Sequence, residues 1–81
     1  NEQGVQVAIY PNPTQDAVWI SLDQTGHYLA VRMLDATGRE ILTEPLFDRI
    51  HKLSLPATQG IYYIQLVDEN GNYTTHAVTK L

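Results

Sequence analysis

Cysteine is absent from this sequence of 81 residues, and that absence removes several classes of structure and chemistry at once. Without cysteine the chain has no disulfide framework, no Cys-x-x-Cys redox or zinc motif and no thiol nucleophile. A domain of this length buries only about 60% of the surface that its unfolded chain exposes. Its stability must therefore come from packing and hydrogen bonds, without covalent or metal staples.

Positive charge is also scarce. Lys and Arg together number 5, against 9 Asp and Glu, and the formal net charge is -4. The basic residues occur singly, so no stripe of them could follow a phosphate backbone, and nucleic acid is not expected as a partner. No apolar run approaches the roughly 20 residues of a membrane-spanning helix, and the first residues lack the pattern of a signal peptide. Any export signal is expected elsewhere in a longer chain, or the domain is itself the signal.

Catalytic patterns are missing as well. His27, His51 and His76 are widely separated and are interpreted as exposed strand and turn residues rather than metal ligands. The two serines lie inside expected strands, and neither belongs to a Gly-x-Ser-x-Gly elbow. Asp16 and Asp23 flank one expected strand at opposite ends, too far apart to act as an acid and base pair. We expect no catalytic residues, no metal, no cofactor and no small-molecule substrate.

Short runs in which apolar and polar residues alternate are typical of half-buried strands, and no helix of useful length is indicated. Turn residues separate the runs at nearly even spacing. The predicted strands are Val5–Tyr10, Ala17–Leu22, Tyr28–Leu34, Glu40–Thr43, Arg49–Leu55, Ile61–Val67 and Tyr73–Lys80. This count predicts that residues 1–81 form one domain, an all-β, seven-stranded, immunoglobulin-like β-sandwich of Greek-key type.

Alternate residues of each predicted strand should face the core, because successive side chains of a strand point to opposite faces. Trp19 falls on the opposite parity from Val18 and Ile20, so it is expected on the surface. The predicted core residues are Val5, Val7, Ile9, Val18, Ile20, Leu22, Leu29, Val31, Met33, Tyr62, Ile64 and Leu66.

Two predicted hairpins share one device, since "DATG" (35–38) and "DENG" (68–71) both place Asp first and Gly fourth. The Asp side chain can accept hydrogen bonds from backbone amides of a type I turn, and Gly can adopt the left-handed conformation that closes the hairpin. The oxygen ligands of the second turn also raise calcium as an alternative. The loop is shorter and poorer in carboxylates than an EF-hand, so the turn interpretation is preferred.

Two proline-containing stretches mark further corners. In "YPNPTQDAVWISL" the prolines fix φ and remove two amide donors, which predicts that the first strand ends at Tyr10 and that the chain turns before Ala17. In "LSLPATQGIYYIQL" a proline is followed by Gly60 and by Tyr62, which shares the parity of the core residues of its strand. Tyr62 is the candidate for a tyrosine corner, with its hydroxyl returning to the backbone a few residues upstream.

Taken in order, these motifs resemble the C-terminal sorting domain of proteins exported by the type IX secretion system of Bacteroidota, in its type A form. The resemblance rests on "YPNPTQDAVWISL", "VRMLDATGREI", "LSLPATQGIYYIQL" and a last strand that ends in "VTKL", and it covers nearly the whole chain. It implies a seven-stranded sandwich, in agreement with the alternation described above.

The resemblance also implies a function. Such a domain stands at the C-terminus of a cargo protein, folds in the periplasm and directs the cargo through the outer membrane to the cell surface or the medium. The implied partners are the outer-membrane translocon, shuttle proteins of the system and a sortase-like cysteine protease that commonly removes the domain, after which the cargo is released or attached to anionic lipopolysaccharide. Leu81 departs from the family pattern, in which many members end on the basic residue. Carried over by position, the recognition residues are Pro11, Asn12, Pro13, Gly38, Arg39, Gly60, Tyr62, Lys80 and Leu81.

Two surfaces are candidates for the recognition itself. The stiff Pro-Asn-Pro turn would lose little entropy on binding. The last strand, "THAVTKL", could be an edge whose free backbone groups pair with a translocon strand or with another copy. Lys80 has a simpler interpretation, as a solvated edge lysine that discourages aggregation. The alternative function is a carbohydrate-binding or adhesion module that uses Trp19 as a stacking platform.

Overall fold

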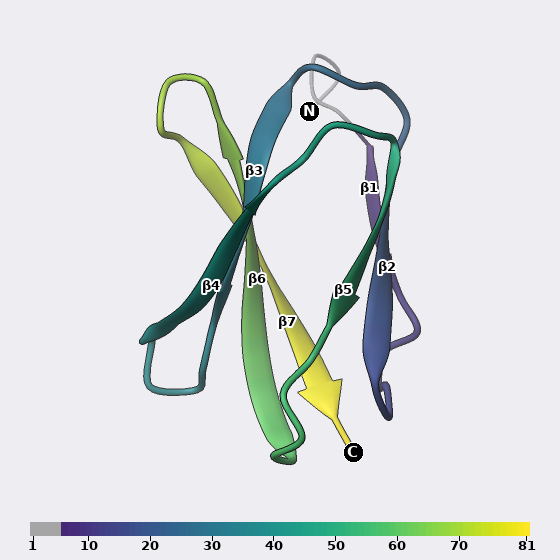
Figure 1. Ribbon diagram of the computed structural model, residues 1–81, viewed down its shortest axis with the longest axis vertical. Helices are drawn as coiled ribbons and strands as arrows, with labels where there is room; N and C mark the ends of the chain where they lie inside the picture. The colour runs from purple at the N-terminus through teal and green to yellow at the C-terminus, as the bar shows by residue number, and fades with distance from the viewer. Residues whose placement is uncertain (1–5) are drawn as a thin grey trace.

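The computed structural model describes residues 6–81, and these residues form strands and no helix (Figure 1). No helix that could span a membrane occurs among them. The strands are β1 (Val7–Tyr10), β2 (Ala17–Leu22), β3 (Tyr28–Leu34), β4 (Glu40–Pro45), β5 (Ile50–Ser54), β6 (Gly60–Asp68) and β7 (Tyr73–Lys80).

The strand prediction is confirmed for the described residues. The bounds of β2, β3 and β7 are those predicted, and the other strands differ at their ends by one or two residues. Val5, predicted as the start of the first strand, lies outside the described residues. As predicted, β1 ends at Tyr10 in front of the prolines.

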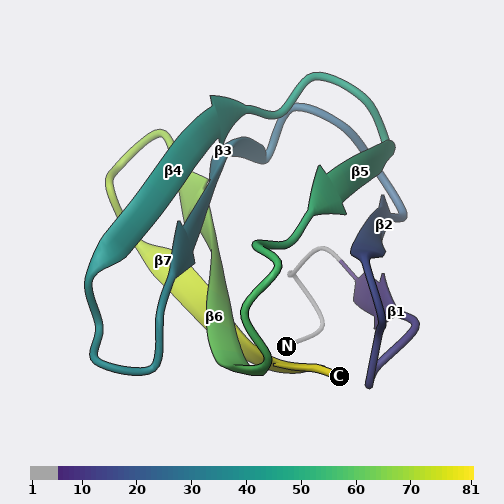
Figure 2. The same ribbon diagram turned by 60° about the horizontal axis from the view of Figure 1, so that its bottom comes forward.

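The strands form two antiparallel sheets, one with the order β1-β2-β5 and one with the order β4-β3-β6-β7. The sheets face each other as two layers (Figure 2). Their inward side chains form one hydrophobic core, while Val7 and Ile9 of β1 are only partly buried against it. The largest fully buried side chains are Ile20, Met33, Leu53, Ile64, Leu66, Val18, Val31 and Val78.

The predicted inward position of Leu29 is wrong. Leu29 is 49% exposed, and its neighbour Tyr28 is in the core instead. The pairing of β3 with β6 contains a register shift between Tyr28 and Ala30. A β-bulge adds one residue to one strand and thereby reverses the side-chain parity on one side of it. Val31 and Met33, beyond the bulge, keep the predicted parity and are buried.

Two histidines are less exposed than predicted. His51 of β5 has its Nε2 atom 3.0 Å from Oε1 of Glu44 on β4, so this contact joins an edge strand of one sheet to an edge strand of the other. His76 of β7 is also partly covered, and burial lowers the pKa of its imidazole because the charged form loses hydration. Both side chains occupy inward-facing positions at sheet edges, where burial is partial.

The tyrosine corner is present at Tyr62, as predicted. Tyr62 is buried at the start of β6, and its hydroxyl donates a hydrogen bond of 2.7 Å to the carbonyl oxygen of Thr58. Gly60, between these residues, has a φ of 144°, which non-glycine residues rarely adopt. The bond therefore fixes the loop in which the chain passes from the three-stranded sheet to the four-stranded sheet.

The variant Tyr62→Phe should lower the free energy of unfolding by about 0.5–1.5 kcal/mol, because it removes the donor to the Thr58 carbonyl and little else. Tyr63→Phe is the matched control, since its hydroxyl makes no hydrogen bond within residues 6–81. Urea unfolding of the two variants measures the difference. Equal losses in the two variants would contradict a specific role for the corner.

Candidate recognition site

The four sequence motifs lie at the same end of the sandwich. Successive strands alternate in direction, so the segments that follow β1, β3, β5 and β7 all emerge at the lower end in Figure 1. These segments carry the Pro-Asn-Pro turn, the Asp35–Gly38 turn, the tyrosine-corner loop and the last residues of the chain. We call this surface the motif end.

The Pro-Asn-Pro turn is attached to the last strand by the side chain of Asn12. The Asn12 Nδ2 atom donates to the Ala77 carbonyl oxygen at 3.1 Å, and Oδ1 accepts from the Thr79 amide at 3.0 Å. The peptide bonds before Pro11 and Pro13 are both cis. Prolines have no N–H, so the side-chain amide supplies the one donor and one acceptor that a peptide group would supply in a sheet.

Thr14 continues this pairing through its backbone. Its amide donates to the Thr79 carbonyl at 2.9 Å, its carbonyl accepts from the Leu81 amide at 2.8 Å, and it forms a parallel bridge with Lys80. The Thr14 side chain is buried and donates to the Ala17 carbonyl at 2.6 Å. The segment after β1 therefore leaves its own sheet and covers part of the β7 edge. The hypothesis of a free edge throughout "THAVTKL" is wrong for this part of the strand.

Lys80 is not the solvated edge lysine of the simpler interpretation. It is only 8% exposed, because it lies on the inward parity of β7, the parity of the buried Val78. Its Nζ atom donates to the carbonyl oxygens of Ala57 at 3.4 Å and Leu81 at 3.1 Å. A lysine can bury its aliphatic stem while its amine reaches polar groups at the rim. Lys80 thus joins the last strand to the tyrosine-corner loop.

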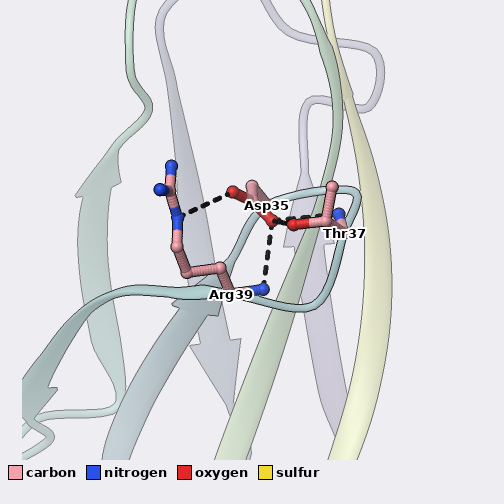
Figure 3. A network of polar contacts seen from close by, with 3 residues as sticks. All are labelled: Asp35, Thr37 and Arg39. Atoms are coloured by element: carbon pink, nitrogen blue, oxygen red, sulfur yellow. Dashed lines mark hydrogen bonds and ion pairs between the residues drawn. The ribbon is translucent and has the colours of Figure 1, made fainter.

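The Asp35 turn has the hydrogen bonds that its sequence predicts (Figure 3). Oδ1 of Asp35 accepts from the amides of Thr37 at 2.9 Å and Arg39 at 3.0 Å and from the Thr37 hydroxyl. The Thr37 hydroxyl first, and then the Arg39 amide, hold the pKa of the Asp35 carboxyl below its usual value of 3.8. Gly38 has a φ of 89°, as the hairpin closure requires.

The same device recurs in the second turn, at the opposite end of the sandwich. Oδ1 of Asp68 accepts from the amides of Asn70 and Asn72, both at 2.9 Å. Gly71 has a φ of 84° and donates to the Asp68 carbonyl at 3.1 Å. Within residues 6–81 no group of three His, Cys, Asp or Glu residues is placed to hold a metal ion. These contacts account for the Asp68–Gly71 turn.

Arg39 is the exposed positive charge of the Asp35 turn. Its Nε atom lies 3.2 Å from Oδ2 of Asp35, and its side chain is 81% exposed. A shallow hollow of about 340 Å³ lies between this turn and the tyrosine-corner loop, and Arg39, Ile41, Pro56 and Tyr62 help to line it. Such a surface can contact an anionic group of a partner through Arg39 and an apolar group through Ile41 and Pro56.

Trp19 lies apart from this hollow. It is 41% exposed, as its parity predicts, and Nζ of Lys52 lies 5.7 Å from the centre of its ring. Trp19, Lys52 and Tyr10 occupy neighbouring positions on the three-stranded sheet.

Thr14 has a structural role that sequence reasoning missed. Its position after a proline gave no signal, because its partners are at the other end of the chain.

Asn12→Ala should remove both bonds to β7 and lower the free energy of unfolding by about 1–3 kcal/mol, at roughly 0.5–1.5 kcal/mol per net hydrogen bond. Hydrogen exchange of the Thr79 amide should accelerate, because that amide donates to Asn12. The control is Asn70→Ala, since the Asn70 side chain makes no hydrogen bond within residues 6–81. An unchanged exchange rate of the Thr79 amide in Asn12→Ala would contradict the bond between this amide and Asn12.

The Asp35 carboxylate should make stability depend on acid pH. Because its pKa is lower in the folded state than its usual 3.8, its contribution is present above that value and is lost as the pH falls through the folded-state pKa. Asp35→Asn should therefore be less stable than wild type at neutral pH, and the difference should shrink in acid. Urea unfolding across this range measures it, with the exposed Asp48→Asn as control. A difference independent of pH would contradict the assignment.

The comparison with known families agrees with the motifs. The family described as the secretion system C-terminal sorting domain matches residues 8–80, a span that contains every proposed recognition residue except Leu81. No curated protein matches the chain. Sorting-signal domains of this kind are not normally catalytic. Because the match spans almost the whole chain, this protein belongs to the family of secretion system C-terminal sorting domains, the signals that direct cargo through the type IX secretion machinery to the cell surface or the medium.

Proposed function

We propose that the type IX machinery recognises the folded domain by its motif end. The observation that carries this proposal is the joining of remote motifs by two sets of contacts, which are Asn12 with β7 and Lys80 with the Ala57 carbonyl. The bond from Tyr62 to the Thr58 carbonyl fixes the loop that Lys80 reaches. A surface held in this way loses little conformational entropy when it binds. The recognition residues are Pro11, Asn12, Pro13, Gly38, Arg39, Gly60, Tyr62, Lys80 and Leu81.

These residues divide by exposure into two roles. Tyr62 and Lys80 are buried, so they act by holding the loop between β5 and β6 against the last strand. Pro11, Pro13 and Arg39 are exposed and are the groups that a receptor can contact directly. Leu81, 53% exposed, adds an apolar side chain beside them.

The domain has no catalytic role in the proposed pathway. It comprises residues 1–81 at the C-terminus of a cargo protein, folds in the periplasm and is carried to the outer-membrane translocon with the help of shuttle proteins. A sortase-like cysteine protease then removes it, and the cargo is released or attached to anionic lipopolysaccharide. Within this pathway the domain supplies a surface to be recognised, and the other proteins carry out the chemistry.

The proposed fold type is the immunoglobulin-like Greek key. The order β1-β2-β5 corresponds to strands A, B and E of that fold, and the order β4-β3-β6-β7 corresponds to C′, C, F and G. The tyrosine corner at the start of β6, the counterpart of strand F, supports the same assignment.

A fluorescent reporter with a periplasmic signal at its N-terminus and residues 1–81 at its C-terminus tests the proposal. Export should occur only in cells with a working type IX translocon. Arg39→Ala should reduce export several-fold without unfolding the domain, because an ion pair made by a side chain as exposed as that of Arg39 contributes little to stability. Arg49→Ala, an exposed arginine before β5 at the opposite end of the sandwich, is the matched control.

Equal export of the two arginine variants would contradict recognition by the motif end. Retention of the folded wild-type reporter in the periplasm of both strains would show that residues 1–81 are not a sufficient signal. Trypsin resistance and urea unfolding of each purified fusion establish that the variants remain folded.

A further inference from the structure

The outer edge of β7 is divided into two parts. In an antiparallel pair, the backbone groups of alternate residues point away from the neighbouring strand. The Ala77 carbonyl and the Thr79 amide point away from β6, since both bond to Asn12. The Thr79 carbonyl also points outward and accepts from the Thr14 amide. By the same alternation, the N–H and C=O of Tyr73 and Thr75 and the N–H of Ala77 also point outward.

These five groups have no hydrogen-bond partner within residues 6–81. We call the segment Tyr73–Ala77 the open edge. It begins after the turn that follows β6 and ends where Asn12 reaches the Ala77 carbonyl. The open edge is therefore the first part of β7, and the Pro-Asn-Pro turn and Thr14 cover the edge of the remaining part.

The other sheet edges of the described part carry features that discourage strand addition. The strand β1 has only 4 residues. The strand β4 ends in a proline, contains two glutamates and has a register shift opposite β3. The strand β5 contains a lysine and is soon followed by Pro56. Short edges, prolines, charges and bulges are the usual means of blocking an edge.

The open edge belongs to a strand of 8 residues and lacks the prolines, charges and bulges of the other edges. Its sequence, "YTTHA", contains no Pro, Lys, Arg, Asp or Glu. The pairing of β7 with β6 runs from Gly60↔Lys80 to Val67↔Tyr73 without a register shift, so no bulge turns the edge away. All of its residues except the partly buried His76 are exposed. A regular, exposed and uncharged row of backbone donors and acceptors fits an extended polypeptide.

We propose that the open edge is the site where an extended segment of a type IX machinery protein adds to the four-stranded sheet as a fifth strand. The inference rests on the proposed recognition of the folded domain and names its binding mode. The added strand spans about five residues, or roughly 17 Å at 3.4 Å per residue. Asn12 fixes where this pairing ends, because its side-chain amide already donates to the next outward acceptor, the Ala77 carbonyl.

A second copy of the chain fits the open edge less well than a partner strand. If two copies pair about a two-fold axis at Thr75, the Tyr73 amide faces an Ala77 carbonyl that already accepts from Asn12. If the axis lies at Thr74, the Ala77 amide faces the turn before Tyr73 and stays unpaired. Each register leaves one outward amide of every copy without a partner. A partner strand with free backbone groups satisfies all five.

Proline substitution tests the inference. Thr75→Pro removes an outward N–H and blocks strand addition. It leaves the backbone pairing of β7 with β6 intact and removes one side-chain bond, which Gln65 Nε2 donates to the Thr75 hydroxyl at 3.3 Å. Thr43→Pro on β4 is the matched control, because Thr43 shares the outward parity of Pro45 at the other edge of the same sheet. In the reporter assay Thr75→Pro should lower export about tenfold or more, whereas Thr43→Pro should stay within about twofold of wild type.

The outcomes separate the two proposals. Wild-type export together with undiminished export of a folded Thr75→Pro reporter overturns strand addition and leaves recognition by the motif end standing. Absence of wild-type export removes the proposed function itself. If Thr75→Pro fails to fold, Thr75→Lys keeps the backbone and places a charge on the edge, and the same loss of export is expected. A wild-type dimer that Thr75→Pro converts to a monomer, with export unchanged, assigns the edge to self-association and overturns the inference.

Discussion

The arrangement of the motif end depends on the pairing of Asn12 and Thr14 with the last strand. This contact draws the segment after β1 out of the three-stranded sheet and attaches it to the edge of the four-stranded sheet. It joins residues separated by 65 and 67 positions, so it closes nearly the whole chain into a loop. In a domain without disulfides, such a closure supplies part of the constraint that a covalent link would provide.

The other contacts at this end build on that closure. Lys80 reaches the tyrosine-corner loop from a strand that is held at this point by Gly60 on one side and by Thr14 on the other. The tyrosine corner in turn holds the wall of the hollow that faces the Asp35 turn. Each bond contributes only about 1 kcal/mol, in net terms, to the free energy of unfolding. Together, however, the bonds connect segments from the ends of both sheets. Rigidity at the motif end therefore comes from the number of segments joined rather than from any one strong interaction.

Sequence predicted the features that depend on local chemistry. Strand positions follow from alternation, the turns at Asp35 and Asp68 from hydrogen bonds within five residues, and the tyrosine corner from Tyr62 and a carbonyl four residues away. Leu29 was misassigned because a bulge depends on how two strands pair, which alternation within one strand does not contain. The roles of Asn12 and Thr14 and the partner of the Lys80 amine depend on contacts between distant segments. The burial of Lys80 itself follows the alternation of β7. Proline spacing identified the turn at residue 11 but gave no information about its partner strand.

The division of the β7 edge bears on how tightly a partner can hold the domain. Five backbone hydrogen bonds at about 0.5–1.5 kcal/mol each, in net terms, sum to roughly 2.5–7.5 kcal/mol. Association in water costs an estimated 4–15 kcal/mol in lost translational and rotational freedom. Strand addition at the open edge alone is therefore weak, and side-chain contacts must add to it. The motif end begins where the open edge stops, at Asn12, so one partner can reach both surfaces along the same strand. A signal that must be bound and then released gains from this arrangement, because the open edge adds only weak binding to that of the motif end.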